Sequence, residues 1–447
     1  MQKVVVVGAG LVGSLQAILL AKKGFEVEVY ERRPDLRKVE LKGGRSINLA
    51  LSTRGWKALK LAGMEKQIEE ITIPMYGRRM HDENGNLSFQ PYGKNDQAIY
   101  SVSRGDLNKR MLLEASKYDN VSFFFDQKCN DLDLKTNTLE FEDKEGNIKK
   151  VTADRIFGTD GAFSAVRTRL MKTDRFNYSQ QYLTHGYKEL LLPANEDGSH
   201  KLDKNALHIW PRGKFMLIAL PNEDGSYTCT LFFPYDGEYS FNSLETKEQV
   251  EDFFKKTFPD FYDIMPNLAD EYFENPTSSL VIIRCEPWNY EDKVLLMGDS
   301  SHAIVPFYGQ GMNAGFEDCS VFSEMYDELG SDWHKLFDEF SKQRKPDGDA
   351  IAQLALDNYI EMRDLVGDEM FLLRKKIENK IYDKHPDKWM PLYSQVTFSH
   401  IRYSEAYETG QKQKRIMDKV MDRDNIKEKW DSDEVENQIL EALNDAD

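Results

Sequence analysis

Cysteine is scarce in this sequence of 447 residues. The four that occur, Cys129, Cys229, Cys285 and Cys319, lie far apart and form no C-x-x-C pair. They are too few for a disulfide framework and lack the spacing of a zinc site, so we expect a reducing, cytoplasmic setting. The eight histidines show no H-E-x-x-H spacing either. We therefore predict that the protein holds no metal.

Basic residues are also in deficit. Lysine and arginine number 59 against 76 aspartate and glutamate, which gives a net charge of −17. A chain this acidic repels phosphate backbones, so nucleic acid is not expected as a partner. The bulk charge still allows a small anionic ligand that is held by one or two local arginines.

Long apolar runs are absent as well. Residues 4–21 carry no charge, but glycines interrupt this stretch, Lys22 and Lys23 close it, and no signal-peptide cleavage site follows. No other stretch approaches the ~18 apolar residues that span a bilayer. The segment 441–447 is polar and acidic. We expect a soluble protein without a membrane anchor.

The first 31 residues have the pattern of a β–α–β unit. Residues 4–7 are four consecutive valines, which is typical of a parallel strand buried on both faces. A glycine-rich turn follows, and the sequence then predicts a helix over 15–23 and a second strand over 25–30. This order of elements is typical of a dinucleotide-binding domain.

The turn carries a G-x-G-x-x-G fingerprint formed by Gly8, Gly10 and Gly13. The first glycine allows a tight turn, the second lets the backbone approach a pyrophosphate, and the third lets the helix pack closely on the strand. Glu31, at the end of the second strand, is placed to accept hydrogen bonds from a ribose. A glycine-rich turn without a ligand is the alternative, but the acidic strand end favours a nucleotide site.

Two later segments also read as a strand followed by a polar turn. Strands predicted over 155–158 and 293–297 lead into Asp160-Gly161 and Gly298-Asp299. Taken singly, each is an ordinary strand end. Together with the first unit they predict one parallel sheet with polar residues at its carboxyl edge, where open α/β sheets bind ligands.

Turn sequences at 82–85 and 222–225 predict two β-hairpins, which we assign to one antiparallel sheet. A glycine turn at 43–44 enters a further strand, a helix is predicted over 52–63, and nearly everything after 317 is helical. At roughly 100–200 residues per domain, the length allows two or three domains.

The predicted fold class is therefore α/β: a Rossmann-type domain with a parallel sheet, a second domain with an antiparallel β-sheet on the substrate side, and a C-terminal helical region. The predicted boundaries are 1–75, 100–177 and 280–330 for the first domain, 76–99 and 178–279 for the second, and 331–447 for the helical region.

In this order the motifs resemble those of the single-component FAD-dependent aromatic hydroxylases. The resemblance rests on the glycine fingerprint, on Asp160-Gly161, and on Gly298-Asp299 with the stretch 306–313 that follows it. It extends from residue 2 to about 410. A narrower resemblance, to the members that hydroxylate kynurenine, rests on the segments 47–52, 101–104, 302–307, 358–363, 391–393 and 396–399.

The resemblance implies a tightly bound FAD in the first domain. Glu31 would contact the adenosine ribose, and Asp299 the ribityl chain. Backbone N–H groups of Met312 and Asn313, at a predicted helix start, would stabilise negative charge on the flavin ring. The implied FAD contacts are Gly8, Gly10, Val12, Gly13, Glu31, Arg32, Ala50, Arg104, Asp299, Met312 and Asn313. Since no second strand-linked fingerprint occurs, NADPH is expected to bind transiently.

The implied substrate is the aromatic amino acid L-kynurenine, so the site needs a carboxylate clamp and an apolar ring pocket. By the resemblance, Arg78 and Tyr92 form the clamp, because a guanidinium matches a carboxylate and a phenol adds one donor. Without the resemblance, a solvated strand arginine beside an ordinary tyrosine is the simpler interpretation. The adjacent Arg79 is expected to point to the opposite face of its strand.

Asn358 interrupts an apolar helical stripe that includes Ile351 and Ala355. A buried amide needs a partner, which a bound ligand or a polar group of the core could supply. The resemblance places Asn358 and Tyr393 on the substrate. The ring would then be walled by apolar side chains that are, individually, more often plain core: Ile218, Leu220, Phe232, Phe307 and Met362.

The resemblance implies a monooxygenase that converts L-kynurenine to 3-hydroxy-L-kynurenine with NADPH and O₂, by way of a C4a-hydroperoxide of the flavin. The cofactor carries this chemistry, while the protein orients the ring and excludes water. Two alternatives stay open: a flavin hydroxylase of another aromatic acid, and a non-catalytic FAD-binding sensor or redox protein.

Overall fold

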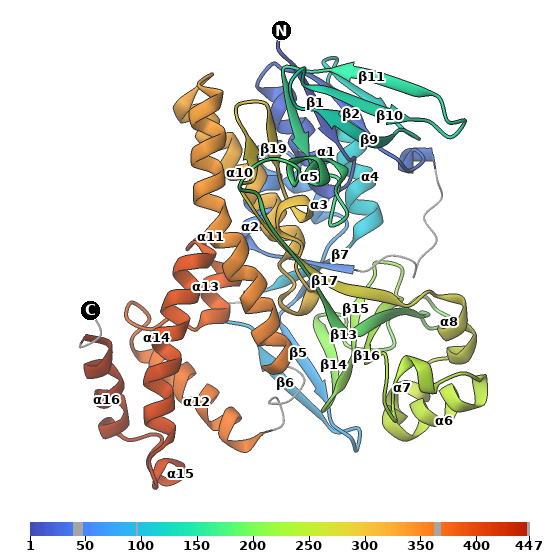
Figure 1. The fold of residues 1–447 in the computed structure, drawn as a ribbon. Coiled ribbons are helices and arrows are strands. Elements are labelled where there is room, and N and C mark those ends of the chain that lie inside the picture. Colours follow the sequence, from blue (N-terminus) through green and yellow to red (C-terminus); the bar gives the residue numbers. More distant parts are fainter. Residues whose placement is uncertain (39–47, 95–96, 362–367, 445–447) are drawn as a thin grey trace.

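Two large β-sheets organise the chain, and the C-terminal helices flank them (Figure 1). The computed structural model describes residues 1–38, 48–94, 97–361 and 368–444, and the structural statements below concern these residues.

The first sheet carries the predicted β–α–β start. Its strands lie in the order β18-β19-β12-β1-β2-β8, and neighbours run parallel apart from β18 and β19. The strands are β1 Lys3–Val7, β2 Glu26–Tyr30, β8 Val121–Phe124, β12 Arg155–Gly158, β18 Asn289–Tyr290 and β19 Val294–Leu296. The prediction that the strands before Asp160 and Asp299 join one parallel sheet is confirmed.

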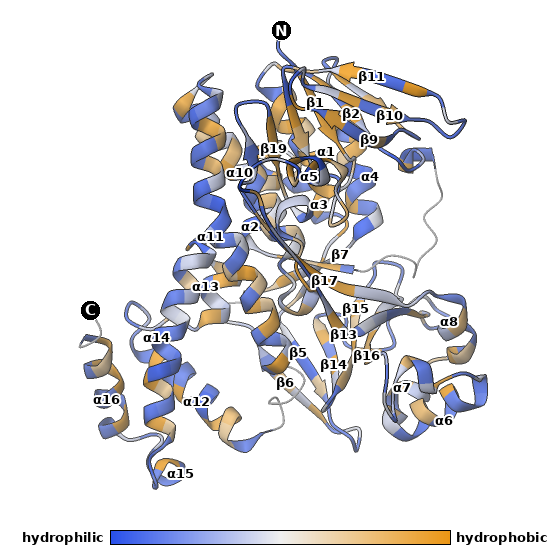
Figure 2. Ribbon diagram, in the orientation of Figure 1, coloured by the Kyte–Doolittle hydropathy of each residue, from blue (hydrophilic) through white to orange (hydrophobic). Residues whose placement is uncertain are grey.

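Helices cover this sheet because its strands are apolar on both faces. Residues 4–7 of β1 are at most 2% exposed. Helix α1 (Leu11–Lys22) packs against α4 (Arg104–Ala115) and α10 (Gly311–Leu329). In Figure 2 strand β1 is largely apolar, in contrast to the mixed surface of the helices.

A three-stranded antiparallel sheet beside this domain was not predicted from the sequence. Its strands are β9 Lys128–Asp133, β10 Thr138–Glu142 and β11 Ile148–Thr152. Few of its side chains face the core, among them Leu139 and Phe141, and most of the others are exposed. The apolar alternation that identifies a strand is therefore weak.

The second sheet has seven strands in the order β17-β13-β16-β15-β14-β5-β6. They are β5 Gly77–His81, β6 Leu87–Pro91, β13 Asn177–Leu192, β14 Ala206–Arg212, β15 Phe215–Pro221, β16 Tyr227–Pro234 and β17 Ser278–Glu286. Both predicted hairpins, β5–β6 and β15–β16, are present. The sheet is antiparallel apart from the pair β5–β14, which is parallel. Strand β17 crosses residue 280, where we predicted the FAD-binding domain to resume; the domain boundaries stay a prediction.

Smaller elements connect the two sheets. Strands β3 (Asn48–Leu51), β7 (Ile99–Ser103) and β4 (Ile73–Met75) form a short sheet. Helix α2 (Thr53–Ala62) follows β3 in the chain, as predicted for 52–63. The glycine turn predicted at 43–44 lies outside the described residues. On one face of the second sheet, helices α6 (Lys247–Thr257), α7 (Pro259–Tyr262) and α8 (Leu268–Glu274) bury an aromatic cluster.

The C-terminal region is helical, as predicted. Its helices are α11 Trp333–Ile360, α12 Glu369–Lys384, α13 Leu392–Phe398, α14 Tyr403–Met421, α15 Ile426–Lys429 and α16 Asp433–Asn444. The last helices share a small core of their own, centred on Trp389 and Met417. Within the described ranges, every helix is too short or too polar to cross a bilayer.

Candidate active site

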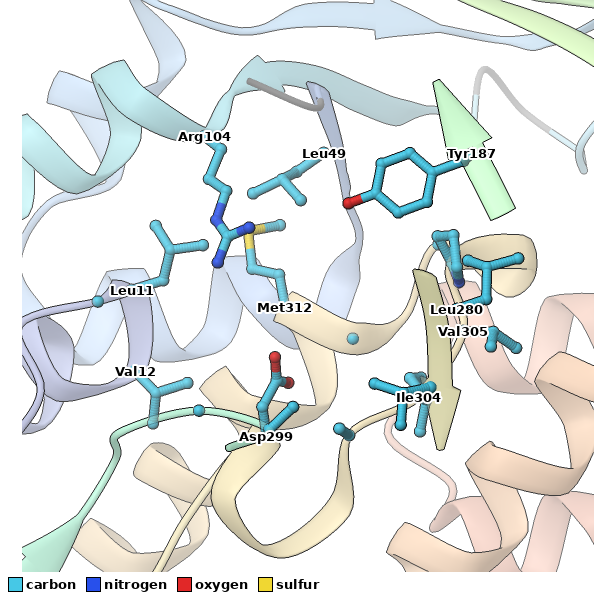
Figure 3. A pocket seen from close by; sticks show the side chains of 18 of the residues that line it. Leu11, Val12, Leu49, Arg104, Tyr187, Leu280, Asp299, Ile304, Val305 and Met312 are labelled. Carbon is cyan, nitrogen blue, oxygen red and sulfur yellow. The ribbon is translucent and has the colours of Figure 1, made fainter. Parts of the chain in front are cut away.

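A cavity of about 590 Å³ lies between the two large sheets. Its wall includes the turn after β1, the ends of β12 and β19, the start of α10 and one face of β15 and β16. Figure 3 shows side chains that line this cavity, among them Arg104, Asp299 and Met312, pointing into one space. This is the carboxyl edge of the parallel sheet, where the sequence predicts a ligand.

The three fingerprint glycines meet different surroundings. Gly8 has φ +100°, a backbone conformation that favours glycine. A Cβ on Gly13 would lie 1.9 Å from the Gly8 carbonyl oxygen, so this position is closed by the packing of α1 on β1. A Cβ on Gly10 would meet nothing within 4 Å, and Gly10 lines the cavity. The space at Gly10 is thus left for a ligand that approaches the backbone.

Glu31 is held rigidly at the end of β2. One carboxylate oxygen accepts a hydrogen bond from the Ala9 amide at 2.8 Å, and the other accepts bonds from the backbone and side chain of Arg33. Burial alone would raise the pKa of Glu31, but the bonds from Arg33 and Ala9 outweigh it and lower the pKa. The carboxylate is therefore ionised and fixed as an acceptor on the cavity wall, next to Arg32.

Asp299 opens the short helix α9 (Asp299–His302) and points into the cavity. Enclosure by the protein raises the pKa of its carboxyl, and the nearby Arg104 guanidinium partly offsets this. The cavity wall also includes Val12 and Ala50, two further predicted cofactor contacts.

Helix α10 directs its first turn at the cavity. Its first intrahelical bond is donated by Ala314 to Gln310, so the N–H groups of Met312 and Asn313 have no acceptor within the helix. Met312 lines the cavity. The Asn313 side chain does not; its amide donates to the Ala50 carbonyl, and its oxygen accepts from the Ser52 amide. Asn313 can therefore face a cofactor by its backbone only.

The residues present fit the FAD that the sequence predicts. An open position at Gly10, a fixed carboxylate at Glu31, a carboxyl at Asp299 and free N–H groups at a helix start lie along one cavity. These are the groups that would meet a pyrophosphate, two sets of sugar hydroxyls and a ring that gains negative charge.

At the other end of the cavity, Arg78 lies over two tyrosine rings. Its guanidinium carbon is 5.5 Å from the ring centroid of Tyr92 and 5.1 Å from that of Tyr393. The Arg78 Nε and the Tyr92 hydroxyl are buried and have no hydrogen-bond partner among the described residues. The predicted neighbour Arg79 points elsewhere and pairs with Asp203 at 2.8 Å.

Four of the five residues of the predicted apolar wall line the cavity, and their contact with a substrate stays a prediction. Ile218 and Leu220 of β15, Phe232 of β16 and Phe307 line it, and the rings of Phe232 and Phe307 are 4.9 Å apart. Met362 lies outside the described residues.

Asn358 does not line the cavity, although the resemblance places it on the substrate. Its amide donates a 2.6 Å hydrogen bond to the Phe307 carbonyl, which satisfies the buried polar group within the core. Asn358 thus fixes the position of Phe307, a wall residue. A role for Asn358 on the substrate itself stays a prediction.

Some wall residues were not predicted as site residues from the sequence. The hydroxyl of Tyr187, on β13, points into the cavity in Figure 3, and Thr230 lines it from β16. Tyr308 also lines it and stacks on Tyr393 at 5.6 Å. Strand alternation identifies which of these side chains share a face, but not which face borders a cavity.

Comparison with known proteins shows which family the chain belongs to. The model of the FAD binding domain family matches residues 1–355. Three similar relatives are each named kynurenine 3-monooxygenase. The relative from Flavobacterium johnsoniae is 54% identical over 442 residues, covering 99% of this chain and 98% of its own length. Those from Dictyostelium discoideum and Sus scrofa are 46% and 45% identical, each covering 94% of this chain and, respectively, 93% and 88% of their own lengths.

Solved structures with low sequence identity share the fold. The tetrameric form of 2-methyl-3-hydroxypyridine-5-carboxylic acid oxygenase is similar with a TM-score of 0.67 at 16% identity, over 83% of this chain and 94% of that one. PqsL, a probable FAD-dependent monooxygenase from Pseudomonas aeruginosa, has a TM-score of 0.64 at 15% identity, over 81% of this chain and 97% of its own. The predicted fold class is confirmed.

Proposed function

The chain belongs to the kynurenine 3-monooxygenase family and carries an FAD binding domain, and we propose that it hydroxylates L-kynurenine to 3-hydroxy-L-kynurenine with NADPH and O₂. One observation of the site carries the choice of substrate class. The buried Arg78 Nε and Tyr92 hydroxyl lack partners among the described residues, and both residues line the cavity. A buried donor pair of this kind calls for an acceptor, and a carboxylate supplies it.

The phenol of Tyr92 is suited to this task because it keeps its proton. Burial raises its pKa well above the ordinary value, with Tyr393 adding to the effect and Arg78 opposing it. A protonated phenol donates one directional hydrogen bond, and the guanidinium supplies the charge. Together Arg78 and Tyr92 would fix the amino-acid end of the substrate and so determine which ring carbon faces the cofactor.

The aromatic ring of the substrate would occupy the part of the cavity lined by Ile218, Leu220 and Phe232. The same wall excludes water from the reacting atoms. Phe307, held through its carbonyl by Asn358, closes one side of it.

FAD, when bound, supplies the redox chemistry that reduces O₂ and delivers one of its oxygen atoms to the ring. Glu31 would hold its adenosine ribose, Asp299 its ribityl chain, and the open start of α10 the ring edge that gains negative charge. NADPH would be a transient co-substrate. A cytoplasmic location is part of this proposal and is supported by four cysteines that are all free thiols.

The test is anaerobic stopped-flow mixing of the purified flavoprotein with NADPH, with and without L-kynurenine. We expect kynurenine to accelerate flavin reduction, and air to yield 3-hydroxykynurenine. Faster coupled NADPH use with another aromatic acid from a substrate panel would identify a different hydroxylase. Bound FAD without kynurenine-stimulated NADPH oxidation or product would show a non-catalytic flavoprotein.

A further inference from the structure

Behind the cavity wall lies a buried cluster of charged side chains that the proposed chemistry does not use. Asp318 on α10 and Asp347 on α11 are both fully buried, and Arg344 lies between them. The Arg344 Nε donates to Asp318 Oδ1 at 2.8 Å, and its Nη1 donates to Asp347 Oδ2 at 3.1 Å. Among the described residues that line the cavity, none of these three occurs.

Asp318 differs from Asp347 in the hydrogen bonds that its second carboxylate oxygen, Oδ2, accepts. Asp318 Oδ2 accepts a hydrogen bond from the Gly298 amide at 2.9 Å and a second from His302 Nε2 at 2.6 Å. Gly298 precedes helix α9, and His302 is its last residue. One carboxylate oxygen therefore ties both ends of the helix that presents Asp299 to the cavity.

The turn at Gly298 has an unusual backbone conformation and is tightly packed. Its backbone has φ +63° and ψ −142°, a region that essentially only glycine visits. A Cβ on Gly298 would lie 2.8 Å from Val12 Cγ2, and one on Gly315 of α10 would lie 2.6 Å from the same atom. The turn is thus wedged between α1 and α10, and Asp318 lies less than one helical turn beyond Gly315.

The charge balance keeps the Asp318 carboxylate ionised in this position. Burial alone would raise its pKa, but His302 and Arg344 outweigh that effect and lower it. An ionised acceptor binds the Gly298 N–H more strongly than a neutral one.

We propose that Asp318 is a positioning residue of the flavin site: by holding the Gly298 amide and His302, its carboxylate fixes the turn that aims Asp299 at the bound cofactor. The inference rests on the proposed FAD site. Asp318 does not touch the cofactor space, so its contribution acts through the backbone of the turn.

The experiment compares FAD binding with stability in two matched variants. Asp318→Asn and Asp347→Asn each remove one buried negative charge beside Arg344, but only Asp318 bonds the Gly298 amide. Asp347 instead bonds Arg402 and Ser404. For each apoprotein, the dissociation constant of FAD is measured by quenching of flavin fluorescence, and the melting temperature is measured without FAD.

We expect Asp318→Asn to weaken FAD binding at least about tenfold and Asp347→Asn by less than about threefold, whatever their melting temperatures. Equal FAD affinity of Asp318→Asn and the wild type, or losses that follow the melting temperature in both variants, would overturn the inference. A wild-type protein that does not bind FAD would instead overturn the proposed function.

A charge-conserving variant covers the case in which Asp318→Asn does not fold. Asp318→Glu keeps the negative charge beside Arg344 but displaces the carboxylate by one methylene from the position that the Gly298 amide bonds. We expect at least the same tenfold loss of FAD affinity, and normal affinity would contradict the inference. Hydrogen exchange in the wild-type apoprotein gives a check without substitution: slow exchange at Gly298 supports the tie to Asp318, and exchange at the rate of an open loop refutes it.

Discussion

The ring of Tyr92 lies parallel to the ring of Tyr393, with the centroids 5.3 Å apart and the planes at 13°. Tyr92 follows an edge strand of the second sheet, whereas Tyr393 belongs to α13 in the C-terminal region. Arg78 lies over both rings. The polar end of the cavity is therefore complete only when the C-terminal helices are docked on the sheet.

Replacing Arg78 by alanine is expected to raise the KM for L-kynurenine about 100-fold, because the substrate carboxylate would lose the guanidinium that pairs with it in the proposed site. FAD binding should be unchanged, since Arg78 belongs to the second sheet and the nucleotide turn to the first. Steady-state kinetics and a flavin titration measure the two effects. Loss of FAD from Arg78→Ala would show that Arg78 serves the cofactor instead.

Arg79→Ala is the matched control for this variant. Arg79 is the next residue of the same strand, but it pairs with Asp203, whose side chain is 41% exposed. An exposed pair of this kind contributes little to stability. We expect the kinetics of Arg79→Ala to match those of the wild type, and a comparable rise in KM would mean that the strand, rather than the guanidinium of Arg78, is responsible.

Tyr92→Phe isolates the hydroxyl from the ring. The Tyr92 hydroxyl is buried without a partner among the described residues, so its removal should not lower the melting temperature of the apoprotein. The stacking on Tyr393 is kept. We expect the KM for L-kynurenine to rise about tenfold, which corresponds to one lost hydrogen bond to a charged group. An unchanged KM would remove Tyr92 from the clamp.

The cofactor side of the site was predictable because its signals are local. The fingerprint at Gly8, Gly10 and Gly13 and the acidic end at Glu31 occur within one β–α–β unit, where the strand and helix dictate which groups meet a pyrophosphate. Asp299 was found in the same way, as a polar turn after an apolar strand.

The substrate side was less predictable because its contacts join distant segments. Helical periodicity correctly indicated that Asn358 is buried, but it did not indicate that the Phe307 carbonyl would satisfy the amide. Tyr187 sits in a long strand without any motif, so only the packing of two sheets reveals that it faces a cavity. The ties of Asp318 to Gly298 and Arg344 likewise depend on how α9, α10 and α11 pack.

Alanine substitutions at two fingerprint glycines should separate ligand binding from folding. A Cβ on Gly10 meets nothing within 4 Å, and its φ of −73° suits alanine, so the apoprotein of Gly10→Ala should fold normally. Its FAD affinity should fall more than about tenfold, because the methyl group occupies the approach of the pyrophosphate.

Gly13→Ala should show the opposite pattern. Its Cβ would lie 1.9 Å from the Gly8 carbonyl oxygen, which forces α1 away from β1. We expect the apoprotein to lose about 1–3 kcal/mol of unfolding free energy, the usual cost of overpacking. Thermal denaturation of both apoproteins measures this, and a stable Gly13→Ala together with an unstable Gly10→Ala would reverse the assignment of the two positions.

His208 is expected to make the protein acid-sensitive. The buried ring donates from Nε2 to the Asp203 carbonyl at 2.9 Å, and its Nδ1 lies 2.9 Å from His81 Nε2. Burial, with a smaller effect of His81, lowers the pKa of His208 to about 4 from the ordinary 6.5. Above pH 6.5 the ring is neutral in both the folded and the unfolded protein. Between pH 6.5 and 4 the unfolded chain binds a proton at this ring, whereas the folded protein does not. Over this pH range the difference in proton binding should lower the free energy of unfolding by about 3 kcal/mol.

Urea denaturation at a series of pH values measures this loss. The free energy of unfolding should fall less steeply with decreasing pH for His208→Gln than for the wild type, and exposed His334→Gln is the control. Identical slopes of unfolding free energy against pH for all three proteins would contradict the assignment.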